Sequence, residues 1–303
     1  MDLIVPLLIG YLLQRNNLLS RRYYDAMIKT ALLVVYPLLA VMSFWAIRID
    51  NNLLWLPVFG VVLHVVPGLL AYTNVNSLYS HAADRGSYLL SAILSNQLIL
   101  GGISVYILYG ETGFAYVQLA VLPQSFILFL VCFPLAQYYQ HELDGGLTPQ
   151  QIAWRSIIFN RNQIGVLGIL AGIILNKMGV KRPEFGNSLF DLFVHVNAWL
   201  SLIPVGHSIR FTELRDYLSA AWRMVSIKFV LTPLIIAGLA ALTVDNYHIK
   251  KTLLVLAFAP TAVNAVITVR LHNLNLAMVM AHFVLTTALY LLIVYPILFI
   301  FLR

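Results

Sequence analysis

The chain of 303 residues is 60% hydrophobic and only 10% charged, and its mean hydropathy is +0.84. Soluble domains average about 45–50% apolar and about 25% charged residues, so a soluble protein of this composition could not cover its own surface. The composition also excludes a disordered chain, a disulfide scaffold and a transmembrane β-barrel, whose strands alternate polar and apolar residues. The sequence therefore predicts an all-α, polytopic membrane protein.

The net charge of +7 comes from 19 Lys and Arg residues scattered between apolar stretches. They form no basic block and no platform of basic and aromatic residues, so we expect no nucleic-acid partner. In membrane proteins, basic residues accumulate in cytoplasmic loops. The single cysteine, Cys132, lies in an apolar stretch, which excludes an intrachain disulfide and a cysteine metal site.

Polar and Gly/Pro-rich points divide the chain into ten apolar segments, each a candidate membrane span. They cover residues 3–16, 24–47, 53–74, 87–109, 113–139, 156–176, 187–207, 219–243, 251–270 and 276–302. We read the first segment as a short retained span, because Asp2 stands where a signal peptide has basic residues. The only long polar connector, predicted as a cytoplasmic linker over 140–155, separates a first half, 1–139, from a second half, 156–303.

Basic residues near the segment ends predict the orientation of the chain in the cell's inner (plasma) membrane. With the N-terminus outside, eleven lie on the inner side: Arg15, Arg21, Arg22, Lys29, Arg85, Arg155, Arg161, Arg210, Arg215, Arg223 and Arg270. The outer side then has seven: Arg48, Lys177, Lys181, Arg182, Lys250, Lys251 and Arg303. This excess favours a multi-pass protein with its N-terminus outside.

Prolines recur at a nearly constant offset in the two halves. Three pairs are separated by 162–167 residues: Pro37 with Pro204, Pro67 with Pro233, and Pro134 with Pro296. The pattern predicts two repeats of five helices, and because five is odd, the second repeat is inverted in the membrane. Inverted repeats are typical of secondary transporters, whose substrate sites lie near the midplane at discontinuous helices.

Segments 87–109 and 251–270 are interrupted by polar residues, Gly or Pro at corresponding places. Proline removes a backbone donor, and freed backbone groups at membrane depth must face protein or a water-filled cavity. Half-helix N-termini at such a cavity attract an anion. We therefore predict a substrate site from both interruptions, although helix packing is the alternative role for each polar residue taken singly. The predicted substrate site consists of Ser95, Asn96, Gln97, Gly101, Pro260, Thr261 and Asn264.

Three titratable residues within the segments are candidates for charge coupling. Lys228 lies nine residues into segment 219–243, where it could contact the substrate or respond to a proton, or else extend to the inner interface. Asp191 and His195 are four residues apart and share a helix face, so a carboxylate–imidazole pair is available for proton uptake. A hydrogen bond at the outer interface is the alternative for that pair.

Several fragments in a fixed order carry a resemblance that covers nearly the whole chain. They include PLLIGYLLQRNNLLS in the first segment, LSNQLILGGISVYILYGETG in the fourth, LVLAFAPTAVNAVI in the ninth and HFVLTTALYLLIVYPIL in the last. On these fragments the chain resembles the auxin efflux carrier family in its short-loop prokaryotic form. Asn96 matches the family's asparagine in helix 4, and Pro260 matches its proline in helix 9. Ile103 departs from the family pattern, which has a proline there.

The resemblance implies the fold of bile-acid sodium symporters, with ten helices in two inverted repeats and helices 4 and 9 crossed and broken. It implies a scaffold from segments 1, 2, 6 and 7 that forms a homodimer. Segments 3–5 and 8–10 would form a transport domain that moves in an elevator mechanism. The implied cargo is a small organic anion, either a carboxylate or an auxin-like molecule.

The sequence thus predicts a secondary active transporter of a small organic anion, driven by an ion gradient or the membrane potential. Its expected partners are that anion, a proton or sodium ion, membrane lipid and a second copy of the chain. A sodium-coupled symporter of the bile-acid type and a non-transporting receptor or channel stay open as alternatives. No zinc-type His/Glu spacing, nucleophile elbow or phosphate-binding loop is present, so we expect no enzyme activity, catalytic residue, metal or cofactor.

Overall fold

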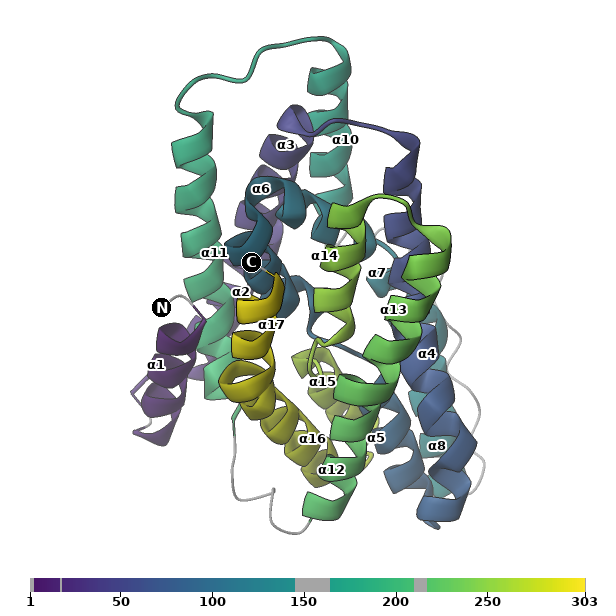
Figure 1. Ribbon diagram of the computed structural model, residues 1–303. Coiled ribbons are helices and arrows are strands. Elements are labelled where there is room, and N and C mark those ends of the chain that lie inside the picture. The colour runs from purple at the N-terminus through teal and green to yellow at the C-terminus, as the bar shows by residue number, and fades with distance from the viewer. Residues whose placement is uncertain (1–2, 17, 145–163, 210–216, 303) are drawn as a thin grey trace.

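The computed structural model describes residues 3–16, 18–144, 164–209 and 217–302 (Figure 1). Every element within these ranges is helical, and the only extended pairing among them is a single bridge between Ser95 and Thr261. The helices form an elongated bundle in which α1 and α11 stand at one side and α4 and α8 at the other. The predicted all-α class is confirmed for this part of the chain.

The helices of the first half follow the apolar segments closely. In chain order they are α1 (Ile4–Arg15), α2 (Arg21–Thr30), η1 (Ala31–Val35), α3 (Tyr36–Ala46), η2 (Asn51–Leu54), α4 (Trp55–Leu78), α5 (Ala82–Ile93), η3 (Gln97–Gly101), α6 (Gly102–Ala120), α7 (Gln124–Ile127), η4 (Leu128–Cys132) and α8 (Phe133–Asp144). Helix α6 contains a reversal at Gly110, whose φ of 63° suits glycine, so that Gly113 packs back against Val105.

The second half has a similar order of helices. They are α10 (Ile164–Lys177), α11 (Gly186–His207), α12 (Leu218–Ser226), η7 (Ile227–Leu231), α13 (Thr232–Thr243), α14 (Tyr247–Ala257), α15 (Val263–Leu271), α16 (Leu276–Leu289), η8 (Tyr290–Val294) and α17 (Tyr295–Leu302). Most of the expected linker, residues 145–155, lies outside the described residues, as do Arg155, Arg161, Arg210 and Arg215. Its first residues are helical, because α8 extends to Asp144, which corrects the predicted start of the linker at residue 140.

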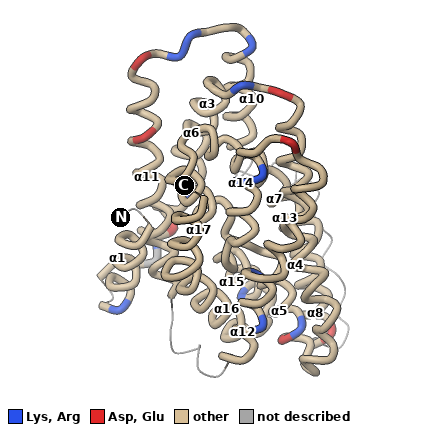
Figure 2. Tube along the Cα trace, in the orientation of Figure 1, with Lys and Arg blue, Asp and Glu red and all other residues tan. Residues whose placement is uncertain are grey.

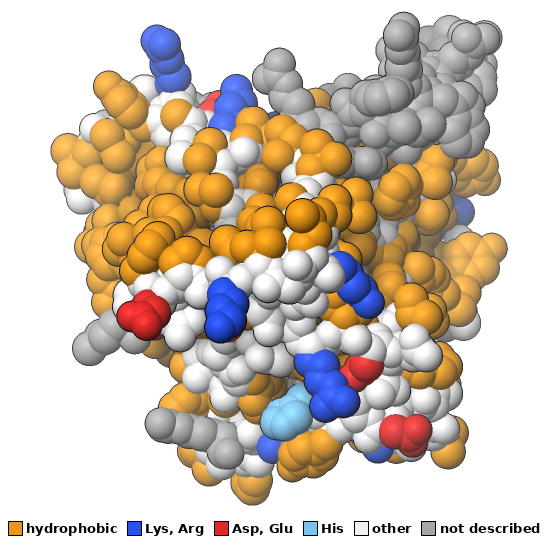
Figure 3. Space-filling model, turned by 90° about the horizontal axis from the view of Figure 1, so that it is seen from above, with side chains coloured by type: hydrophobic (Ala, Val, Ile, Leu, Met, Phe, Trp, Pro, Cys, Tyr) orange, Lys and Arg blue, Asp and Glu red, His pale blue; other side chains and the backbone are white. Residues whose placement is uncertain are grey.

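Within the described ranges, six helical stretches are long and apolar enough to cross a membrane. They are Arg22–Ala46, Asn51–Leu78, Gln97–Leu143, Gly186–His207, Leu218–Thr243 and Leu276–Leu302. Helices α1 and α10 are apolar but shorter. Charged residues gather mostly toward the two ends of the bundle (Figure 2). Seen from the end with the α10–α11 connection, they stand among extensive hydrophobic surface (Figure 3). The architecture is that of a multi-pass helical membrane protein.

Four π-helical stretches share one cause. Stretches η1, η4, η7 and η8 each end two residues before a proline, at Pro37, Pro134, Pro233 and Pro296 respectively. Proline has no N–H and its ring clashes with the carbonyl four residues earlier. A π-turn moves that carbonyl away by bonding it one residue further along the helix. The helices therefore continue through these prolines.

The helices divide by packing into two groups. The first helix set consists of α1, α2, η1, α3, α10 and α11, with α1 against α11 and α3 against α10. These pairs approach closely at glycines: a Cβ on Gly206 would lie 2.1 Å from the Leu7 carbonyl oxygen, and one on Gly168 would lie 2.5 Å from that of Pro37. Small residues allow such approach in membrane helices. The second helix set comprises the other helices from η2 onward, and it meets the first through η3 and α6.

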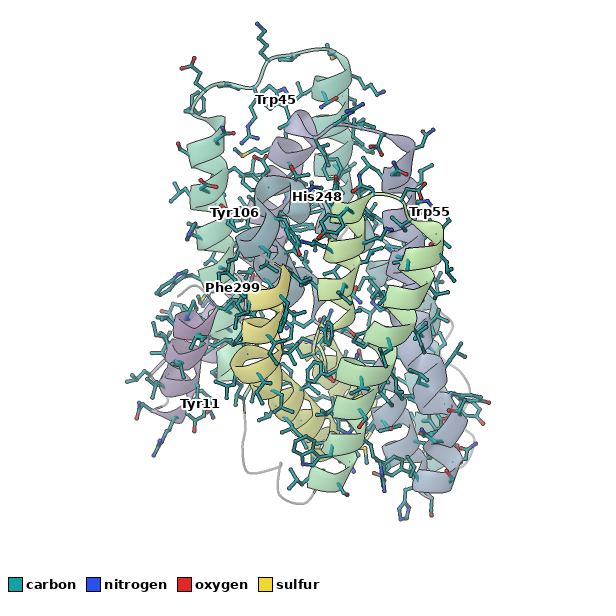
Figure 4. The ribbon with its side chains drawn as sticks, viewed as in Figure 1. Tyr11, Trp45, Trp55, Tyr106, His248 and Phe299 are labelled. Carbon is teal, nitrogen blue, oxygen red and sulfur yellow. The ribbon has the colours of Figure 1, made fainter. Side chains whose placement is uncertain are left out.

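Aromatic side chains mark the end of the bundle that carries the α10–α11 connection. Trp45 and Trp55 lie toward this end (Figure 4), and the Trp45 Nε1 donates a hydrogen bond of 2.6 Å to the Val180 carbonyl. Tryptophan is enriched where membrane proteins meet the bilayer interface. The position of these residues is therefore consistent with a membrane boundary there.

Candidate functional site

Two helices are interrupted in the middle of the bundle, at the places where the polar residues predict it. Helix α5 ends at Ile93 and η3 begins at Gln97, while α14 ends at Ala257 and α15 begins at Val263. Figure 1 shows α14 and α15 end to end, with a non-helical connection between them. Pro260 accounts for the second interruption, because it has no N–H and restricts the residue before it.

The two non-helical stretches pair with each other, and we call residues 94–96 and 260–262 the paired segments. The Asn96 N–H donates to the Pro260 carbonyl at 2.7 Å, and the Ala262 N–H donates to the Leu94 carbonyl at 2.9 Å. Ser95 and Thr261 face each other in this antiparallel bridge. Backbone groups freed by one interruption are thus satisfied by the other, as buried amides require.

Side chains bond to further backbone groups around the paired segments. The Thr261 hydroxyl donates to the Ser91 carbonyl at 3.2 Å, and the Thr261 N–H donates to Thr286 Oγ1 at 3.1 Å. Ser91 lies in the last turn of α5, where carbonyls have no partner within the helix. Thr261 therefore joins the end of α5 to α16 across the paired segments.

A cavity of about 130 Å³ lies beside the paired segments. The second helix set contributes Ser95, Asn96 and Asn264 to its wall. The first helix set contributes Ile28 of α2, Leu32 of η1, and Ser201, Pro204 and Val205 of α11. A second cavity of about 130 Å³ adjoins it and shares four lining residues, Leu32, Leu98, Gln124 and Asn264. The cavity thus lies between the two helix sets.

The polar groups of this cavity suit an anion. Asn96 is 5% exposed, and its Nδ2 has no hydrogen-bond partner among the described residues. The first turn of α15 has no side-chain cap, and Ala262, Val263 and Asn264 all line the cavity. The positive end of the α15 dipole therefore lies at the cavity wall, as at other anion sites on helix N-termini. A free amide donor and uncapped N–H groups both attract a carboxylate.

The structure separates the seven predicted site residues into two groups. Ser95, Asn96 and Asn264 line the cavity, whereas Gln97, Gly101, Pro260 and Thr261 do not. Pro260 and Thr261 hold the paired segments together. A Cβ on Gly101 would lie 2.8 Å from Leu256 Cδ2, so this glycine allows close packing against α14.

Gln97 is fully buried, and neither atom of its amide has a hydrogen-bond partner among the described residues. Two polar lining residues were not predicted, Gln124 and Ser201. The signal that could have found them is a polar residue on an apolar helix, which alone does not distinguish a site from helix packing.

Lys228 contacts the paired segments directly. It lies in η7, its side chain is 1% exposed, and its Nζ donates to the Ala92 carbonyl at 2.5 Å and to Ser95 Oγ at 2.6 Å. The side chain therefore does not extend to a membrane interface, which was one of the two alternatives. Ser95 links the ammonium to the cavity, because Ser95 also lines it.

Asp191 and His195 do not form the carboxylate–imidazole pair that their spacing allows. The His195 Nδ1 donates to the backbone carbonyl of Asp191 at 2.6 Å, and the Asp191 carboxylate accepts from the Tyr106 hydroxyl of α6. Both residues lie on α11 outside the cavity wall. No group of three or more His, Cys, Asp or Glu residues in the described part of the chain could hold a metal ion.

The fold and the cavity define a class: a multi-pass helical membrane protein with a mainly apolar cavity, lined by a few polar side chains, where two interrupted helices pair. No protein-family model matches the chain, and no curated protein matches it.

Proposed function

We propose that this protein is a secondary active transporter of a small organic anion, of the auxin efflux carrier type, driven by an ion gradient or the membrane potential. The single observation that carries the proposal is the cavity between two helix sets at the paired segments. Discontinuous helices at a midplane site are the hallmark of transporters that work by alternating access.

The order of elements supports the proposed inverted repeat. In each half, an interrupted pair of helices is followed by a helix that contains a π-helical stretch before an aromatic–proline pair, η4 before Phe133–Pro134 and η8 before Tyr295–Pro296. The interruptions at 94–96 and 258–262 lie at the same place in these two sequences of helices. We therefore propose ten membrane spans in two inverted repeats of five.

The packing of the helix sets supports an elevator mechanism. We assign the first helix set to a scaffold that forms a homodimer and the second to a transport domain. Away from the cavity, the Phe114 ring of α6 packs against Phe190 of α11, and two polar contacts accompany this packing: the ion pair between Glu111 of α6 and Arg182, just before α11, at 2.5 Å, and the Tyr106–Asp191 hydrogen bond. These contacts close one side of the α6–α11 interface, and movement of the transport domain would break them.

The size of the cavity supports a small cargo. An engineered protein cavity of about 150 Å³ holds benzene, so two adjoining cavities of about 130 Å³ each accommodate roughly six to twelve non-hydrogen atoms. The Asn96 amide and the N-terminus of α15 would bind the carboxylate. Asn264 and Ser201 would bind other polar atoms of the anion.

A thermal-shift screen of the purified protein against mono- and dicarboxylates tests the site. We expect Asn96→Ala to abolish the shift that any true ligand produces. Its unliganded Tm should stay within about 2 °C of wild type, because Asn96 Oδ1 accepts only one long hydrogen bond of 3.4 Å from the Leu100 N–H. Asn74→Ala on α4, away from the cavity, is the matched control and should keep the ligand shift. A shift that survives in Asn96→Ala would show that the site lies elsewhere.

Counterflow in proteoliposomes tests the mechanism. A carrier exchanges labelled for unlabelled substrate, so internal unlabelled anion should accelerate uptake of the labelled anion. A channel gives no such stimulation, and a receptor gives no uptake. The sodium-coupled alternative is tested in the same vesicles by replacing sodium with choline, which should abolish uptake only in a symporter that uses sodium.

A further inference from the structure

Lys228 is the only Lys, Arg, Asp or Glu among the buried side chains of the described residues. Its ammonium has no carboxylate within 4.0 Å among those residues, and its two partners are a backbone carbonyl and a hydroxyl. Burial of an ammonium is costly unless it is compensated. An apolar side chain of similar length would avoid that cost, so the charge at this position needs a physical reason.

The reason lies in the end of α5. The Ala92 carbonyl belongs to the last turn of α5, where carbonyls have no partner within the helix and the helix dipole is negative. The neighbouring Ser91 carbonyl is satisfied by Thr261, and the Leu94 carbonyl is satisfied by Ala262. The Ala92 carbonyl and Ser95 Oγ both accept hydrogen bonds from the ammonium.

In transporters, carbonyl oxygens at the end of an interrupted helix bind cations. Unwound backbone carbonyls and the C-terminal ends of half-helices coordinate the coupling Na⁺ in carriers with discontinuous helices. Here the two oxygens lie 2.5 and 2.6 Å from one covalently attached nitrogen. The Lys228 ammonium thus binds the same type of group, a carbonyl at the C-terminal end of a half-helix.

Building on the proposed carrier function, we propose that Lys228 is a tethered cation that fills a sodium-type oxygen site, so that this protein binds its cargo and moves without sodium. The charge travels with the second helix set, because η7, α5 and the paired segments all belong to it. Ser95 accepts from Lys228, so its own hydroxyl hydrogen is free to donate into the cavity toward a carboxylate.

Thermal unfolding of the purified protein tests the proposal with simple cations as probes. Wild-type Tm should be the same in sodium chloride and in choline chloride of equal ionic strength. Lys228→Ala should lower the Tm by roughly 5 °C in choline, because two charge-assisted hydrogen bonds are lost. Sodium should then raise the Tm of Lys228→Ala saturably. The matched control is Lys177→Ala, an exposed lysine on α10, whose Tm should respond to neither change.

Chemical rescue adds a second readout. Propylammonium has the atoms that Lys228→Ala removes, so it should restore at least half of the lost Tm, whereas 1-propanol, which has no charge, should not. Lys228→Arg retains the charge and should be indifferent to sodium, which keeps the test available if Lys228→Ala does not fold. Stabilisation of the wild type by sodium, or an Ala variant that propylammonium restores but sodium does not, would overturn the proposal.

These measurements are independent of cargo. If no organic anion shifts the Tm of the wild type while sodium stabilises only Lys228→Ala, the carrier proposal fails and the tethered cation stands. If an anion binds and counterflow occurs while the wild type requires sodium, the carrier stands and the tethered cation fails.

Discussion

The close contact between α1 and α11 makes a quantitative prediction about stability. A Cβ on Gly206 would lie 2.1 Å from the Leu7 carbonyl oxygen, and one on Gly10 would lie 2.0 Å from that of Ile203. Real Cβ atoms do not approach oxygen within 3.0 Å, so Gly206→Ala forces the two helices apart by about 1 Å, which forfeits a quarter to a half of each dispersion contact. Overpacking of this kind costs about 1–3 kcal/mol. The Tm should therefore fall by roughly 2–6 °C.

Thermal unfolding in detergent, followed by tryptophan fluorescence, measures this effect. The matched control is Gly238→Ala on α13, where nothing lies within 4 Å of the added carbon and alanine favours the helix by up to about 1 kcal/mol. One separation of the helices relieves both clashes, so the double variant Gly10→Ala/Gly206→Ala should lose less than the sum of its single variants. Equal Tm values for Gly206→Ala and Gly238→Ala would refute the reasoning.

Two further predictions concern the hydrogen bonds of the second helix set. Thr261→Val leaves the buried Ser91 carbonyl without its donor and should cost about 1–3 kcal/mol of unfolding free energy. The control, Thr243→Val on the exposed surface of α13, should change the unfolding free energy by less than about 0.5 kcal/mol. Equal losses in the two variants would contradict the role of Thr261 in joining α5 to α16. Burial lowers the pKa of His272, between α15 and α16, below its usual value near 6.5. As the pH falls, His272 therefore takes up a proton at a higher pH in the unfolded chain than in the folded protein, which favours unfolding. The Tm of the wild type should fall more between pH 7.5 and pH 5.5 than the Tm of His272→Gln. Parallel curves of Tm against pH for the two proteins would exclude this effect.

The sequence predicted where the helices are interrupted, because the signal is local. Proline at 260 and the polar run at 95–97 disfavour a helix whatever surrounds them, and α14 and α5 end within three residues of these positions. The sequence did not predict which polar residues line the cavity. Ser95 and Asn96 do and Gln97 does not, because side chains in a non-helical stretch point in directions that residue type does not determine.

Long-range packing explains the other differences. Ser201 reaches the cavity only because α11 passes beside the paired segments, and no local pattern reports that. For Lys228, the position along the helix was clear from the sequence, but its direction around the helix axis was not. That direction decides between a side chain that extends to the lipid interface and one that binds the end of α5.

The π-helical stretches determine the direction in which side chains point around a helix axis. A π-turn contains one more residue than the α-turn it replaces, so each stretch turns every later side chain by about 100° around the axis, relative to an uninterrupted helix. Stretch η7 holds Lys228 itself, between α12 and α13. The proline after it thus sets how the two halves of this helix face their neighbours. Removal of one residue from η7 would keep a helix of nearly the same length but would present a different set of side chains to α5. The π-helical stretch η7 therefore sets the rotation of one part of the helix relative to the other.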